Sequence, residues 1–231
     1  MGIPIKFDNN DVTGYQRWNY KWWYALAEFV DNSTHNYYAN RKALDTIYQQ
    51  NGEKLNVRIT NDRDDDEDVI QIFDNAMGMD EEDLADAFDF GRRKTNPGRS
   101  AYGLGMKTAA IWMGDLFEIE TSKLGHGKKI MVVFDVQKVA REGLRSLEST
   151  VTECDKDLHY TKITVRKLTK RLRGSTVRKV KDHLASIYRC DLRQNILNLE
   201  YNGSSLEWTL YDEDSFMEAR DGSKYKQEYE F

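Results

Sequence analysis

The spacing of apolar residues changes from a helical period to a strand period along the chain. Within residues 17–41, small or apolar side chains recur at intervals of three and four, which is the period of one helix face. We therefore predict a helix from about Arg17 to Arg41 that packs this stripe inward. The stripe consists of Trp22, Ala25, Leu26, Phe29, Val30 and Ser33. Leu55–Thr60 and Val69–Phe73 instead alternate as amphipathic strands do, which predicts a hairpin through a loop at 61–68.

The rest of the chain mixes short helical and strand patterns. We expect an irregular arm over residues 1–14 and a long, basic, glycine-containing loop over 91–102. Because the elements do not follow a regular βαβ alternation, the pattern favours an α+β fold with helices on one face of a mixed, mostly antiparallel sheet. The further helices are predicted at 80–90, 104–113 and 177–188, and the further strands at 115–122, 128–136, 162–168, 196–201 and 206–211.

The composition is that of an ordinary globular protein, with 39% hydrophobic and 32% charged residues and a net charge of −5. No run of about 18 apolar residues occurs, so we expect no membrane span. The N-terminus has no apolar signal core. Cys154 and Cys190 lie far apart in the sequence and cannot form a disulfide framework. We therefore expect an intracellular location, cytoplasmic or nuclear.

One segment is strongly basic, although the chain as a whole carries a net negative charge. Residues 161–181 contain nine Lys or Arg and no acid. Such a segment favours an anionic partner such as DNA, but a solvated surface explains it equally well, and both interpretations stay open. The candidate DNA-contacting residues are Arg171, Arg173, Arg178, Lys179 and Lys181.

Three short motifs carry the candidate chemistry, and the first is Glu28-Phe29-Val30-Asp31-Asn32. Glu28 and Asn32 are four residues apart, so on a helix they project from the same side. The Asn32 oxygen could ligate magnesium, which takes few protein oxygens together with phosphate and water. Glu28 could orient, or accept a proton from, a water that attacks a γ-phosphate. For this pair alone, a solvated helix shoulder is the more ordinary interpretation.

The second motif, Asp74-Asn75-Ala76-Met77-Gly78-Met79, follows the predicted strand Val69–Phe73. An acid at a strand end can accept a hydrogen bond from an adenine amino group. Gly78 would let the backbone approach the base closely, and Met77 and Met79 could pack against its flat face. An ordinary Asp-Asn turn would have a similar sequence.

The third motif, Gly103-Leu104-Gly105-Met106-Lys107, opens a predicted helix. A glycine turn at a helix start offers free N–H groups and the positive end of the helix dipole to phosphate oxygens. Lys107 adds a point charge in the first helical turn. The loop before the motif is placed to act as a lid over a triphosphate, and its cations are Arg92, Arg93, Lys94 and Arg99.

Together and in this order, the three motifs resemble those of the GHKL ATPase superfamily, which includes gyrase, the ninety-kilodalton heat-shock chaperones, histidine kinases and MutL. Ala27–Ser33, Phe90-Gly91-Arg92 and Gly103–Lys107 look most like the Morc-like branch. The resemblance covers roughly residues 15–200. It implies a Bergerat-type ATP-binding sandwich with ATP and Mg²⁺ as ligands.

The resemblance also implies roles for individual residues. Glu28 would be the general base, Asn32 the magnesium ligand and Asp74 the adenine acceptor, with Lys107 as a second catalytic residue at the phosphates. Two positions depart from the family pattern, because Ala76 replaces a common glycine and Tyr160 replaces a glycine before Thr161. The further expected nucleotide contacts are Gly78, Met79, Gly103, Leu104, Gly105, Met106 and Thr161.

The expected domains are an ATP-binding domain at 1–173, including the N-terminal arm, and a linking helix with a partial transducer-like region at 174–231. The leading functional interpretation is a slow ATPase that acts as an ATP-dependent homodimerisation switch in a DNA-associated protein. One alternative is a nucleic-acid-binding protein whose ATPase is secondary. A histidine-kinase-type phosphotransferase is a weaker alternative, because only 27 residues precede Glu28, too few for an upstream phosphoacceptor hairpin.

Overall fold

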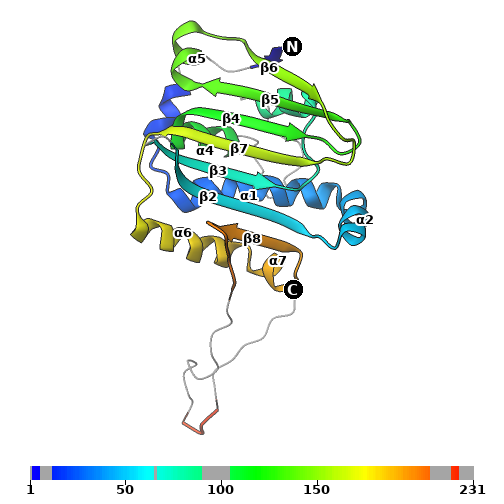
Figure 1. Cartoon of the computed structure of the whole chain (residues 1–231). Helices are drawn as coiled ribbons and strands as arrows, with labels where there is room; N and C mark the ends of the chain where they lie inside the picture. Colours follow the sequence, from blue (N-terminus) through cyan, green and yellow to red (C-terminus); the bar gives the residue numbers. More distant parts are fainter. Residues whose placement is uncertain (1, 6–11, 65–66, 90–104, 209–219, 224–231) are drawn as a thin grey trace.

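A computed structural model describes residues 2–5, 12–64, 67–89, 105–208 and 220–223. Within these residues, nine strands form one sheet in the order β1-β6-β5-β4-β7-β3-β2-β8-β9 (Figure 1). The β2–β8 pair is parallel and the other pairs are antiparallel. The strands are β1 (Gly2–Pro4), β2 (Leu55–Asp64), β3 (Glu67–Asp74), β4 (Gly114–Ser122), β5 (Lys128–Asp135), β6 (Ser146–Glu153), β7 (Tyr160–Leu168), β8 (Leu197–Tyr201) and β9 (Ser204–Ser205).

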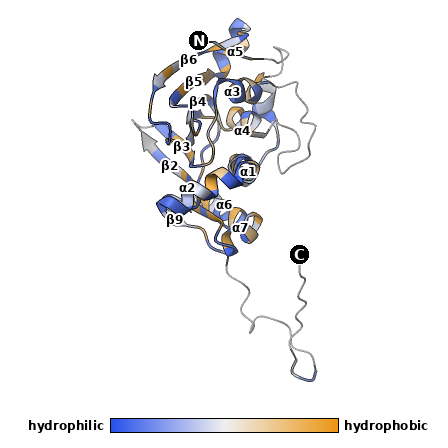
Figure 2. Cartoon of the chain, turned by 90° about the vertical axis from the view of Figure 1, so that its right-hand side faces the viewer, coloured by the Kyte–Doolittle hydropathy of each residue, from blue (hydrophilic) through white to orange (hydrophobic). Residues whose placement is uncertain are grey.

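The helices that build the site lie on one side of this sheet. Figure 2 views the sheet from its edge and shows α1, α3 and α4 together on that side. The predicted α+β class, with a mixed and mostly antiparallel sheet, is therefore confirmed. The helices are η1 (Val12–Arg17), α1 (Trp22–Ala39), α2 (Arg41–Asn51), α3 (Glu81–Ala87), α4 (Gly105–Met113), α5 (Val136–Glu142), α6 (Gly174–Ile187) and α7 (Arg189–Arg193).

The buried stripe of α1 fixes which of its residues face the site. All six predicted stripe positions, from Trp22 to Ser33, are buried. Burial of each large apolar side chain contributes about 1.5–3 kcal/mol, so this face determines how the helix is rotated against the sheet. The predicted helix at 17–41 is nevertheless too long, because α1 begins at Trp22 and ends at Ala39. Asn40 leaves the helical conformation, and a separate helix, α2, follows it.

Several elements differ from the sequence prediction. Residues 61–64 and 67–68, predicted as loop, extend the β2–β3 hairpin, with Asp62 paired to Val69. The predicted arm contains β1, in which Ile3 pairs with Leu147 of β6. The predicted strand at 206–211 is wrong at 206–208, because β9 ends at Ser205, and 209–211 lie outside the described residues.

No helix among the described residues is both long enough and apolar enough to cross a membrane.

Candidate active site

The first and third motifs meet where α1 passes the start of α4. A Cβ placed on Gly105 would lie 1.8 Å from Glu28 Oε2 and 2.5 Å from the carboxyl carbon of Glu28. The Glu28 carboxylate therefore lies directly against the backbone that opens α4. Any side chain at position 105 would require this carboxylate to move away from the start of α4. The geometry brings together an acid and a helix N-terminus that are 77 residues apart in the sequence.

The surroundings of Glu28 favour a basic carboxylate. Burial raises the pKa of Glu28, the hydrogen bond from Tyr20 opposes the rise, and the negative charge of Asp31 adds to it. The Tyr20 hydroxyl donates to Glu28 Oε1 over 2.9 Å. A carboxylate with a raised pKa accepts a proton more readily than an exposed one, which suits a general base.

Asn32 lies one turn further along α1 and is half-buried. Its carboxamide has no hydrogen-bond partner among the residues that the structure describes. The same residues contain no group of three or more His, Cys, Asp or Glu side chains that could hold a metal ion. One amide oxygen fits a magnesium ion whose other ligands are phosphate and water, and does not fit a site built from protein ligands alone.

Asp74, at the end of β3, connects the second motif to α1. Its side chain is buried, with Oδ2 accepting a 2.8 Å hydrogen bond from the Ser33 hydroxyl. Oδ1 accepts a 3.0 Å bond from the Ala76 N–H. Burial outweighs both bonds and the charge of His159, and raises the pKa of Asp74 from 3.8 to about 6. A further hydrogen-bond donor, such as an exocyclic amine, would stabilise the charged form of this buried carboxylate.

The two threonines beside Asp74 come from neighbouring strands. Thr161 of β7 pairs with Asp74 of β3 and with Thr121 of β4, so all three side chains lie on the same face of the sheet. The Thr161 and Thr121 hydroxyl oxygens are 3.3 Å apart, and Thr121 Oγ1 accepts a 2.9 Å bond from the Met79 N–H. Thr121 was not predicted, since only the strand register places it here.

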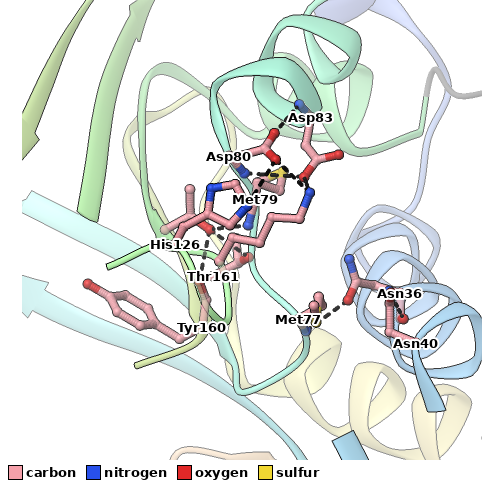
Figure 3. Close-up of polar contacts among 11 residues, drawn as sticks. Asn36, Asn40, Met77, Met79, Asp80, Asp83, His126, Tyr160 and Thr161 are labelled. Atoms are coloured by element: carbon pink, nitrogen blue, oxygen red, sulfur yellow. Dashed lines mark hydrogen bonds and ion pairs between the residues drawn. The ribbon is translucent and has the colours of Figure 1, made fainter. Parts of the chain in front are cut away.

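Hydrogen bonds to several other segments of the chain hold the turn after Asp74 in place. Asn36 Oδ1 of α1 accepts from the Met77 N–H over 2.8 Å (Figure 3). The Met77 carbonyl accepts from the Leu124 N–H over 3.0 Å, and His159 Nδ1 lies 2.8 Å from the Ala76 carbonyl. Sequence reasoning missed Asn36, although its spacing of four residues from Asn32 placed it on the same helix face.

The neighbouring turn carries a compact charged group around Asp80 (Figure 3). Asp80 caps α3 by accepting from the Asp83 N–H, and Lys123 Nζ lies 2.6 Å from Asp80 and 2.7 Å from Asp83. Burial alone would raise the pKa of Asp80, but the Asp83 N–H and the Lys123 ammonium lower it to about 2. This group fixes α3 to the β4–β5 connection beside the Asp74 turn.

Gly78 has a positive φ of 74°, and a Cβ there would lie 1.8 Å from the Ser122 carbonyl oxygen. The position was predicted to let a base approach, and in the structure the missing side chain also makes room for β4.

We expect Gly78→Ala to destabilise the fold by more than about 1 kcal/mol, measured by urea denaturation, because it adds both a strained φ and a backbone clash. Gly125→Ala is the matched control, since Gly125 has φ +82° with nothing within 4 Å of the new Cβ. Equal losses in the two variants would show that the Ser122 contact contributes nothing.

Lys107 is placed differently from its predicted role. Its side chain is only 1% exposed, and Nζ donates to the Asp89 carbonyl oxygen over 2.5 Å. Met79 and Met106 are half-buried and pack against the core. Gly103, Leu104 and the cations of the expected lid lie outside the described residues. The structure thus brings Glu28 to Gly105 and Asp74 to Thr161, with the Ser33 hydroxyl connecting α1 to the second group.

In a comparison with protein families, the family described as "Histidine kinase-, DNA gyrase B-, and HSP90-like ATPase" matches residues 20–161. This range contains all three motifs and ends at Thr161. A comparison with curated proteins gives no match.

Proposed function

We propose that this chain, which belongs to the histidine kinase-, DNA gyrase B-, and HSP90-like ATPase family, binds ATP with magnesium and hydrolyses it slowly. The observation that carries the proposal is the contact between the Glu28 carboxylate and Gly105 at the start of α4. It places a proton acceptor at a helix N-terminus, where phosphate oxygens are favoured. The direct test is phosphate release from ATP in the presence of magnesium.

In the proposed reaction, Glu28 takes a proton from the water that attacks the γ-phosphorus. The bond from water oxygen to phosphorus forms as the bond to the β–γ bridging oxygen breaks, and ADP leaves with that oxygen. Asn32 would hold a magnesium ion, which neutralises charge on the phosphates. Gly103, Leu104, Gly105 and Met106 would offer backbone groups to the phosphates. Lys107 reaches them only if its ammonium leaves the Asp89 carbonyl.

The adenine would sit against the second motif. The Asp74 carboxylate would accept from the exocyclic amine, with Thr161 beside it and Met79 against the ring. Gly78 keeps the turn close to β4. The support for this arrangement is the burial of Asp74 and the fixed turn that follows it.

We further propose that ATP drives two copies together and that hydrolysis releases them. The support is two exposed aromatic residues, Trp18 in the segment between η1 and α1, which is 49% exposed, and Tyr24 in the first turn of α1, which is 53% exposed. Exposed aromatic side chains are enriched at protein interfaces. Sedimentation with and without a non-hydrolysable ATP analogue tests this, and an unchanged monomer contradicts it.

A DNA-associated role, as in the Morc-like branch that the motifs resemble, rests on part of the basic segment. Lys162 pairs with Glu120, and the ammonium groups of Lys170 and Lys181 lie over aromatic rings. These three cations are therefore engaged within the fold. Arg173, Arg178 and Lys179, at the start of α6, are exposed and could contact phosphates.

We expect DNA binding that weakens steeply between about 50 and 200 mM salt, because bound phosphates release counterions. Changing Arg173, Arg178 and Lys179 together to Glu should weaken binding more than about tenfold and flatten the salt dependence. Fluorescence anisotropy of a labelled duplex measures both. The matched control is Lys128, Lys138 and Arg141 changed to Glu, on β5 and α5. A salt-independent affinity contradicts the proposal.

A further inference from the structure

Tyr20 lies between the two helices that form the proposed catalytic contact. Its hydroxyl donates to Glu28 Oε1 of α1 over 2.9 Å. Its ring meets Trp112 of α4 edge-on, with ring centroids 5.7 Å apart and an interplanar angle of 86°. Tyr20 is therefore in contact with the helix that carries the acid and with the helix that begins at Gly105.

The partner of the Tyr20 ring is itself firmly held. Trp112 is buried, and its indole N–H donates to the Trp18 carbonyl over 3.0 Å. Trp22 packs edge-on against Trp112, with centroids 5.2 Å apart, and the Lys170 ammonium lies 4.7 Å from the Trp112 ring centroid. Aromatic packing of this kind leaves Tyr20 few alternative positions, so its hydroxyl is a fixed donor.

The two oxygens of Glu28 have different surroundings as a result. Oε1 accepts the Tyr20 hydrogen bond, whereas Oε2 is the atom nearest to a Cβ placed on Gly105. Because a carboxylate that rotates freely cannot keep one oxygen aimed at a reacting water, a fixed donor on the other oxygen has a direct catalytic use.

We propose that Tyr20 is a positioning residue for hydrolysis, which holds Glu28 by Oε1 so that Oε2 remains directed to the start of α4. The inference rests on the proposed role of Glu28 as general base. Tyr20 itself touches neither the nucleotide nor the attacking water in this account. Its effect on the rate passes through the orientation and the charge of Glu28.

The Tyr20 hydroxyl also affects the pKa of Glu28. Burial and the negative charge of Asp31 both raise the pKa of Glu28, and the Tyr20 hydrogen bond opposes them. Burial and the nearby Glu28 also raise the pKa of Tyr20 well above its ordinary value, so the phenol stays protonated and remains a donor. Removal of this donor should leave Glu28 protonated up to a higher pH.

The test is Tyr20→Phe, which keeps the ring against Trp112 and removes only the hydroxyl. We expect the single-turnover rate of ATP hydrolysis at neutral pH to fall about tenfold, the typical effect of losing a hydrogen bond to a charged group. The Kd for a non-hydrolysable analogue should stay within about twofold. The acidic limb of the pH–rate profile should move to higher pH, because more Glu28 is protonated at each pH.

Tyr37→Phe is the matched control, since it also removes a tyrosine hydroxyl that donates to a carboxylate, Asp45 Oδ1, over 2.7 Å. It should leave the pH–rate profile unchanged. In a Glu28→Gln background, Tyr20→Phe should have no further effect on the rate. If Tyr20→Phe does not fold, 3-fluorotyrosine at position 20, a stronger donor, should move the acidic limb to lower pH.

Two results would overturn the inference while leaving the proposed function intact. One is a Tyr20 variant with the unmodified rate and pH–rate profile, in a protein whose hydrolysis still requires Glu28. The other is a loss of nucleotide affinity and thermal stability that accounts for the whole fall in rate. Hydrolysis that persists in Glu28→Gln would instead contradict the proposed function itself.

Discussion

Glu28→Gln is expected to reduce phosphate release by about 10²–10⁴-fold while ATP binding persists, because the amide keeps the shape of the side chain but cannot accept the proton from water. Phosphate release measures the chemical step, and calorimetry with a non-hydrolysable analogue measures binding. Glu28→Ala should give the same separation of the two activities. The affinity should change by less than about threefold, since Glu28 contacts the attacking water rather than the nucleotide in the proposed reaction.

The control for this change is Glu53→Gln at an exposed position after α2, which should leave both measurements unchanged. Loss of binding and hydrolysis together in Glu28→Gln would mean that Glu28 holds the site in shape and is not its base. Undiminished phosphate release would remove Glu28 from the reaction altogether.

Asp74→Asn is expected to weaken ATP binding about 10–100-fold, the cost of losing a charged acceptor for a buried hydrogen bond. An amide that keeps the Ala76 N–H bond through its oxygen would turn its NH₂ toward the Ser33 hydroxyl and the adenine amine. The preference for ATP over GTP should fall as well, because GTP has an oxygen at the position of that amine. Calorimetry with the two nucleotide analogues measures both effects.

Asp45→Asn is the matched control, since Asp45 also accepts a hydrogen bond from a side-chain hydroxyl, that of Tyr37, but lies on α2. It should change neither the affinity nor the preference. An Asp74→Asn protein that still prefers ATP by the original factor would exclude Asp74 as the adenine acceptor.

The raised pKa of Asp74 predicts that a rise in pH lowers the stability of the fold and raises the affinity for ATP. The pKa in the folded protein is raised from 3.8 to about 6, so folding favours the protonated acid. This contribution to stability is complete below about pH 4 and is lost as the pH rises through about 6. Binding needs the charged acceptor, so the affinity should rise over the same interval. An affinity that falls as the pH rises through 6 would contradict the assignment.

The part of the site that the sequence predicted depends on local spacing. Glu28 and Asn32 were assigned to one side of a helix because they are four residues apart, and α1 contains both. Asp74 was assigned to a strand end, where β3 ends. In each case the backbone period alone decides the direction of the side chain.

The contacts that were not predicted depend on distance in space rather than in sequence. Thr121 reaches the Met79 N–H only because β4 pairs with β7 in one particular register. Tyr20 reaches Glu28 because aromatic packing on Trp112 fixes the segment before α1. No period in the sequence specifies either contact, since each depends on how two separate elements pack.

The strands β6 and β1, at the edge of the sheet, were also not predicted, because they depend on contacts between distant parts of the chain. β6 has a single buried residue, Leu147, so its sequence shows no apolar alternation and did not predict a strand. β1 is three residues long and exists through its pairing with β6. The same holds for Lys107 within the site. Its position on the helix did not predict the hydrogen bond from its ammonium to the Asp89 carbonyl, which depends on how α4 packs.

The most direct measurement is a crystal structure of the protein with magnesium and a non-hydrolysable ATP analogue. We expect the adenine amine within hydrogen-bonding distance of Asp74, magnesium bound to Asn32 and the phosphates, and the γ-phosphate near Gly105 and Glu28. A nucleotide bound elsewhere, with these four residues in contact only with one another or with solvent, would contradict the proposed site.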